Sequence, residues 1–202
     1  LPLADASTAA RYALQADADG FRLEDREARR MIQRTVGHSG EAARHMISIL
    51  ETIATWERAL ALRNPRTAMN PDDVPFHFRE ALAADGTGDT SRHPDGTITL
   101  DIDGREGGIA KIRGDLWVAN RTQQPLHLLL VHCPEDYGIE VLANERIEPT
   151  VDEFRLPLMR GPGLTFSLDP KDGNEVVHRF KLIVSTEKVD DFPVSYTHLT
   201  LP

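Results

Sequence analysis

The chain has 202 residues, of which 40% are apolar, and this composition fits a folded protein with one sizeable core or two small ones. Its 32 acidic and 23 basic residues give a net charge of -9 at pH 7, which disfavours nucleic acid and anionic membrane surfaces as partners. The single cysteine, Cys133, excludes an intramolecular disulfide and a multi-cysteine metal site. This cysteine usage is compatible with a reducing compartment, so we expect a cytoplasmic location.

The first region, 1–35, is predicted to contain a β-hairpin. Residues 11–15 and 21–24 alternate apolar and polar side chains on either side of 16–20, whose Asp and Gly residues suit a turn. The chain begins without an initiator methionine or a signal pattern, so we expect coding sequence upstream. Because a two-stranded ribbon is not stable alone, we interpret the hairpin as the remnant of a larger sheet.

The second region, 36–73, is predicted to hold one amphipathic helix and a proline-rich crossing segment. Apolar residues recur at steps of three and four from Gly40 to Leu62, with Ser39 as the expected N-cap. The predicted buried stripe consists of Met46, Ile49, Leu50, Ile53, Trp56 or Glu57, and Leu60. The helix is expected to end before Pro65, because the residue preceding a proline is pushed out of the α region. The prolines of 64–75 mark the candidate domain boundary.

The third region, 74–193, changes to a period of two with turn signals between short runs, which is typical of strands. The predicted strands are 76–82, 97–102, 108–120 in one or two pieces, 126–133, 138–142, 153–158, 164–168 and 176–185. Such strands without intervening helices predict a mainly β fold (α+β overall), an antiparallel β-sandwich of about seven or eight strands. The sequence leaves open an immunoglobulin-like topology or another Greek key. Residues 83–96 are expected to form a surface loop.

The last nine residues, 194–202, resemble the translated read-through of a sequencing adapter. We therefore expect this tail to be an artefact that takes no part in the fold. The longest apolar run of the whole chain, 126–131, is far shorter than the roughly 20 residues that span a bilayer, so no transmembrane segment is predicted.

Cys133 follows His132, which raises the question of a nucleophile with its base. Adjacent residues on a strand point to opposite faces, so these two side chains are not expected to meet. Cys133 also closes an alternating run before Pro134, and a half-buried packing thiol is the favoured interpretation. We predict no catalytic residue in this chain, with a Cys133-dependent enzyme kept as an alternative.

No metal ion or other cofactor is predicted. The eight histidines include no pair at the helical spacing of a zinc-protease motif. The glycines of 104–108 lie between two predicted strands and indicate a hairpin, whereas a phosphate cradle opens a helix. The carboxylates of 101–103 and 169–173 are too sparse for a calcium loop and are explained by turns.

Two loops are candidates for a binding role. The first is an acidic turn after a predicted strand and contains Asp136 and Tyr137, and the second is the Gly/Pro loop 158–164 with Arg160 and Pro162. Binding surfaces on β-sandwiches commonly lie in such loops. Well-formed turns are the favoured explanation of both segments. The alternative function that they support is a module that binds a small ligand or a glycan.

Three groups of segments resemble bacterial caspase-like (metacaspase-type) proteins of the C14 peptidase group. Residues 53–65 are similar to the linker that follows the protease domain in many of these proteins. The pairs 118–130 with 136–140 and 180–186 with 190–192 resemble the β-rich accessory domain that follows the linker. The Asn-Arg-Thr stretch in the first pair matches that domain's order of strand, turn and aliphatic strand.

The resemblance implies a non-catalytic accessory or interaction domain of a larger cysteine peptidase. The activity of that family requires a His and a Cys on an α/β domain, and this chain has neither the strand and helix alternation nor a matching pair. No catalytic residue is therefore carried over to any position. The expected partner is the upstream peptidase domain of the same chain or another protein.

Overall fold

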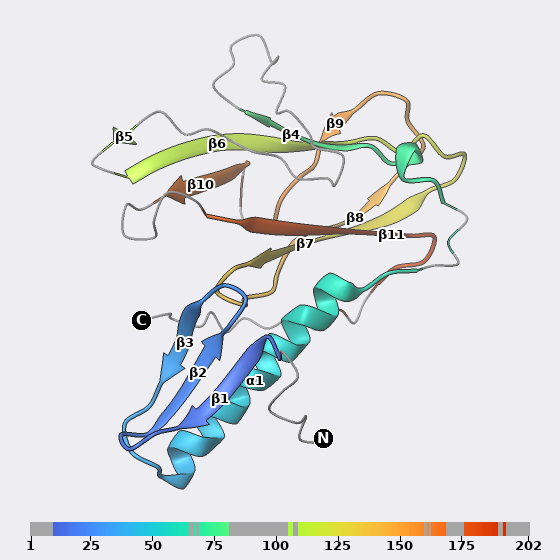
Figure 1. Cartoon of the computed structure of the whole chain (residues 1–202). Coiled ribbons are helices and arrows are strands. Elements are labelled where there is room, and N and C mark those ends of the chain that lie inside the picture. Colours follow the sequence, from blue (N-terminus) through green and yellow to red (C-terminus); the bar gives the residue numbers. More distant parts are fainter. Residues whose placement is uncertain are drawn as a thin grey trace. The chain divides into compact units, whose positions relative to one another are not determined.

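The computed structural model describes residues 10–64, 67, 69–80, 105–106, 109–159, 161, 163–168, 176–189 and 192. These residues form the predicted mainly β fold with one long helix, and their strands make three antiparallel sheets (Figure 1). The predicted strand 97–102, the loop 83–96 and the tail 194–202 lie outside the described residues.

The chain divides into two compact units. Unit 1 contains the described residues up to Ala61 together with Asp136–Gly138, and unit 2 contains those of Leu62–Glu135 and Ile139–Val194. The break after Ala61 coincides with the end of the helix, just before the proline-rich segment.

Unit 1 begins with a three-stranded antiparallel sheet. The strands β1 (Tyr12–Ala16) and β2 (Phe21–Asp25) form the predicted hairpin, and β3 (Arg30–Arg34) adds to the other edge of β2. The strand β3 was not predicted, because a register shift between Leu23 and Glu24 interrupts the simple alternation along this pair. Ile32 is buried in this strand, whereas Met31 is 44% exposed.

The helix α1 (Gly40–Ala61) follows the sheet and confirms the predicted amphipathic helix. The Ser39 hydroxyl accepts a hydrogen bond of 3.1 Å from the amide of Ala42, which is the predicted N-cap. Its buried residues are Met46, Ile49, Ile53, Trp56 and Ala59. This stripe faces β2, whose Leu23 is fully buried.

Unit 2 contains the other two sheets. The strands of the first sheet are β4 (Phe76–Glu80), β5 (Arg105–Glu106), β6 (Ile109–Val118), β9 (Phe154–Arg155) and β10 (Leu164–Leu168), with β6 at its centre. The second sheet has the order β11-β7-β8, formed by β7 (Leu126–Pro134), β8 (Glu140–Ile147) and β11 (His178–Ser185). A short 3-10 helix, η1 (Pro71–Asp73), precedes β4.

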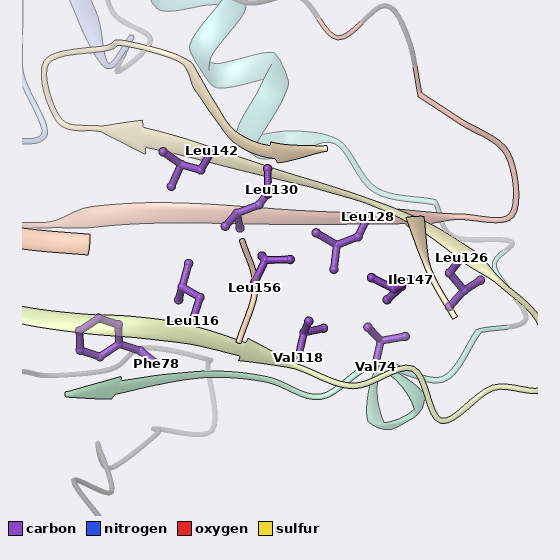
Figure 2. Packing of buried hydrophobic residues seen from close by; sticks show 11 residues of the cluster. Val74, Phe78, Leu116, Val118, Leu126, Leu128, Leu130, Leu142, Ile147 and Leu156 are labelled. Carbon is purple, nitrogen blue, oxygen red and sulfur yellow. The ribbon is translucent and has the colours of Figure 1, made fainter. Parts of the chain in front are cut away.

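The two sheets pack face to face around one apolar core, which makes unit 2 the predicted β-sandwich (Figure 2). Leu116 and Val118 enter this core from β6, and Leu128 and Leu130 enter it from β7. Each pair is separated by two positions, so the period of two in the sequence corresponds to the inward face of each strand.

The connection from β6 to β7 is held by one buried polar side chain. The Asn120 amide nitrogen donates to the carbonyl oxygens of Gln124 at 2.9 Å and Ile147 at 3.1 Å. Its side-chain oxygen accepts from the Thr122 amide at 3.1 Å and from the Thr122 hydroxyl at 2.6 Å. Asn120 therefore has partners on both ends of its amide, as a fully buried Asn requires.

Candidate functional site

The predicted binding residue Tyr137 lies in the core of unit 1. It follows the turn after β7 with a φ of 64° and is fully buried. Its ring makes edge contacts with Trp56 and Tyr12, at centroid distances of 5.2 and 6.0 Å, and the guanidinium of Arg30 lies 5.4 Å from its centroid. In this conformation the ring packs inside unit 1 and presents no face for a sugar or another ligand.

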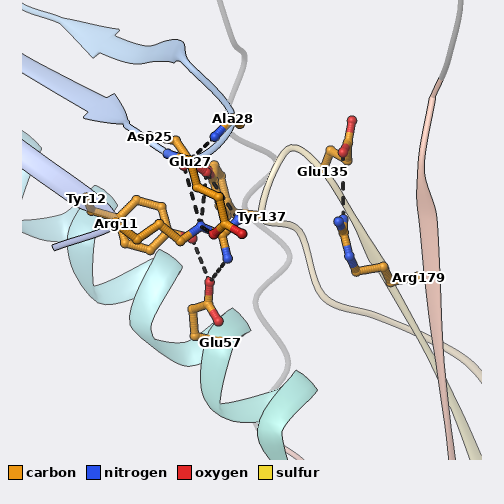
Figure 3. Close-up of polar contacts among 9 residues, drawn as sticks. All are labelled: Arg11, Tyr12, Asp25, Glu27, Ala28, Glu57, Glu135, Tyr137 and Arg179. Atoms are coloured by element: carbon orange, nitrogen blue, oxygen red, sulfur yellow. Dashed lines mark hydrogen bonds and ion pairs between the residues drawn. The ribbon is translucent and has the colours of Figure 1, made fainter. Parts of the chain in front are cut away.

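The hydroxyl of Tyr137 donates a hydrogen bond of 3.0 Å to the carboxylate of Asp25 (Figure 3). Asp25 is fully buried at the end of β2 and also accepts from the amides of Glu27 and Ala28, both at 3.0 Å. Burial by itself would raise the pKa of Asp25, but the hydrogen bonds from Ala28, Arg11 and Tyr137 outweigh it and lower this pKa. The buried group is therefore a carboxylate.

Arg11 supplies the charge opposite Asp25. Its guanidinium lies 3.1 Å from Asp25, 3.1 Å from Glu27 and 2.7 Å from Glu57 on α1. The hydroxyl of Tyr12 donates to the same Glu57 oxygen at 2.6 Å. The network joins the start of β1, the end of β2 and the helix, which is the arrangement of a structural ion-pair cluster.

Of the other predicted loop residues, the structure describes Asp136 alone. Asp136 is half-buried, and its carboxylate accepts a hydrogen bond of 3.0 Å from the amide of Gly138, which closes the turn around Tyr137. Arg160 and Pro162 lie outside the described residues. Their neighbour Gly163 has a φ of 79°, and an added Cβ there would lie 2.8 Å from the carbonyl oxygen of Gly114.

A small hollow lies at the β2–β3 turn of unit 1. It has a volume of about 190 Å³ and is lined by Glu24, Asp25, Arg26, Arg29, Arg30 and Met31. Pockets for small molecules and cofactors usually have volumes of roughly 300 Å³ or more. This hollow is smaller than a usual small-molecule pocket.

Cys133 is fully buried on β7. Burial raises the pKa of its thiol to about 11, even though the positive charges of Lys181 and Arg179 oppose this shift. A nucleophilic cysteine needs the opposite conditions, a lowered pKa and access to solvent. The environment of Cys133 is that of a packing thiol.

His132 points away from Cys133 and pairs with a histidine of the neighbouring strand. Its Nε2 lies 3.0 Å from Nδ1 of His178, and its ring stacks on Phe180 with a centroid distance of 4.9 Å. The ring of Phe166, on the opposite sheet, lies 4.8 Å from that of His178. The sequence did not reveal this pair, because 46 positions separate the two histidines and only the β7–β11 register brings them together.

Two imidazoles do not complete a protein metal site, since zinc sites use three or four protein ligands. Among the residues that the structure describes, no group of three or more His, Cys, Asp or Glu side chains is placed to hold a metal ion. In the same part of the chain, no helix is long and apolar enough to cross a membrane.

A second polar cluster lies on unit 2, at Glu153. Its carboxylate is 3.2 Å from Nε2 of His77 and 3.9 Å from the guanidinium of Arg121, and it accepts a hydrogen bond from Arg79. The guanidinium of Arg79 also lies over the ring of Trp117, 4.5 Å from its centroid. Sequence reasoning missed this cluster, although the polar residues at alternate positions of 111–117 signalled an exposed strand face.

The chain matches no protein-family model, no curated protein and no solved structure.

Proposed function

We propose that the chain is a non-catalytic interaction domain, the accessory region of a larger caspase-like cysteine peptidase. The observation that carries the non-catalytic part is the environment of Cys133, the one thiol of the chain. A cysteine peptidase reacts through a thiolate, and a fully buried thiol with a pKa of about 11 is a poor source of one at neutral pH.

The titratable groups with shifted pKa values also fit a non-catalytic role. Asp25, Arg11 and Tyr137 use their charges and hydrogen bonds on one another. Each of them joins separate elements of unit 1, so their perturbation is explained by folding. Structural ion-pair networks shift pKa values just as active sites do, so these shifts do not require a catalytic site.

The link to caspase-like proteins rests on the sequence motifs. Residues 53–65 include the end of α1, and 118–130 run from the last residue of β6 through a turn into β7. In such a protein the chain would act in the cytoplasm. Its partner would be the upstream peptidase domain or another protein.

The gene itself offers the first test. The coding sequence upstream of Leu1 is expected to specify an α/β domain with the His and Cys of a caspase-like peptidase. An upstream domain without such a pair would contradict the assignment to this family.

The second test uses the full-length gene product and a fluorogenic peptide substrate. The Cys133→Ser variant is expected to keep the peptidase activity of the parent, whereas substitution of the upstream cysteine abolishes it. The isolated chain is expected to hydrolyse no peptide. Loss of activity in a folded Cys133→Ser protein would identify Cys133 as the nucleophile and overturn the proposal.

A further inference from the structure

The outer face of the first sheet of unit 2 gathers basic side chains around Trp117. Residues directly opposite each other in antiparallel strands share a face. The register places both His77 and Arg155 opposite Trp117, and Arg79 opposite Asp115. The alternate residues of β6 enter the sandwich core, so this face points away from it.

The charge of this face is opposite in sign to that of the chain. Its described basic residues are His77, Arg79, Lys111, Arg113, Arg121 and Arg155. Among the described residues, the carboxylates that pair with them are Asp115 and Glu153. Because the whole chain carries a net charge of -9, an acidic partner would be repelled elsewhere and attracted here.

The face already binds carboxylates of the chain itself. Glu153 is held by His77, Arg79 and Arg121, and Asp115 lies 2.7 Å from the guanidinium of Arg155. Guanidinium groups donate charge-assisted hydrogen bonds to carboxylates, so the side chains of this face suit acidic groups.

Two further cations on the same face are available for additional carboxylates. Lys111 and Arg113 are exposed, and neither forms an ion pair within the part of the chain that the structure describes. They alternate along β6 with Trp117 on the same side, and the seven residues from 111 to 117 extend for about 20 Å. An extended peptide of about six residues matches this length.

We propose that this face binds an extended acidic segment of a partner protein. Lys111 and Arg113 pair with its carboxylates, and the ring of Trp117, held under Arg79, supplies the apolar contact. Aromatic and Arg side chains are the types that most often dominate binding energy at protein interfaces. The inference rests on the proposed role as an interaction domain and specifies that the bound segment of the partner is acidic and extended.

The test measures the affinity of the purified chain for a fluorescein-labelled hexaglutamate peptide by fluorescence anisotropy at low salt. The double variant Lys111→Glu/Arg113→Glu is expected to weaken binding at least tenfold. The matched control is Arg58→Glu/Arg146→Glu, which makes the same change in net charge at two exposed arginines outside this face. The control is expected to weaken binding less than threefold.

Two probes separate the possible sources of negative charge. A labelled ten-nucleotide dT oligomer tests nucleic acid, and tighter binding of this oligomer than of hexaglutamate would overturn the proposal. Absence of peptide binding, or equal weakening by both double variants, would also overturn it. These binding measurements do not depend on peptidase activity. The proposal for this face can therefore be refuted while the accessory role stands, and the accessory role can be refuted while the face still binds acidic peptides.

Discussion

The hydroxyl of Tyr137 donates a hydrogen bond of 3.0 Å to the carboxylate of Asp25, a residue 112 positions earlier in the chain. Both groups are fully buried in unit 1. Burial raises the pKa of Tyr137, which keeps its hydroxyl protonated and able to donate. A three-residue segment between β7 and β8 therefore completes the polar core of the N-terminal unit.

Replacing Tyr137 with Phe is expected to destabilise unit 1 by about 1–2 kcal/mol, because the buried carboxylate loses one donor while the ring stays in place. The measurement is urea unfolding followed by Trp fluorescence in a Trp117→Phe background. Trp56 is then the only tryptophan, and its ring centroid lies 5.2 Å from that of Tyr137. Tyr12→Phe is the control and should cost less, because its acceptor Glu57 is 38% exposed. Equal stability of Tyr137→Phe and the parent would contradict the role of this hydrogen bond.

The lowered pKa of Asp25 predicts that the folded protein loses stability in acid. Its pKa is lowered in the folded state, so the stabilisation is fully present above the pKa of an unfolded Asp, roughly 4, and is lost as the pH falls through the folded value. Asp25→Asn is expected to be less stable than the parent at pH 7 and to differ less from it near pH 2.5. Urea midpoints across this range measure the difference. A constant difference at all pH values would mean that ionisation of Asp25 does not contribute.

The strongest periodic patterns of the sequence predicted their elements well. The helix was found with its N-cap, because apolar steps of three and four and a Ser before them are local signals. The strand 164–168 has the bounds that its alternation predicts. The strand β3 was missed, because its register shift against β2 depends on the partner strand.

The predicted site residues show the limit of local reasoning. Tyr137 stands in an acidic turn, which in isolation resembles an exposed loop, and only the tertiary structure reveals its burial against Trp56. The pairing of His132 with His178 likewise depends on a strand register that no short motif encodes. The sequence did predict that the Cys133 thiol is at least half-buried, because its run of alternating apolar residues is a local pattern.

The burial of Cys133 predicts that its thiol reacts slowly with thiol reagents. The native protein at pH 7.5 is expected to react with Ellman's reagent at least a hundredfold more slowly than the protein in 6 M guanidinium chloride, because the thiol is buried and protonated. The raised pKa stabilises the fold below the pKa of an unfolded thiol, and this contribution is lost as the pH rises through about 11. As a control, Val151→Cys in a Cys133→Ser background should react rapidly, since Val151 is 79% exposed. Rapid native labelling of Cys133 would contradict its burial.

The close packing around Gly114, on the inward side of β6, predicts that one added methyl group is not tolerated there. A Cβ at this position would overlap the ring of Phe78 and lie 2.5 Å from the carbonyl oxygen of Arg79, so β4 would have to move. Gly114→Ala is therefore expected to destabilise unit 2 by about 1–3 kcal/mol, measured by thermal unfolding followed by circular dichroism. Gly40→Ala is the matched control, because the nearest atom to its added Cβ is the Arg44 Nη1 at 3.6 Å. It should change stability by less than about 0.5 kcal/mol, and equal effects of the two substitutions would refute the close packing of β4 on β6.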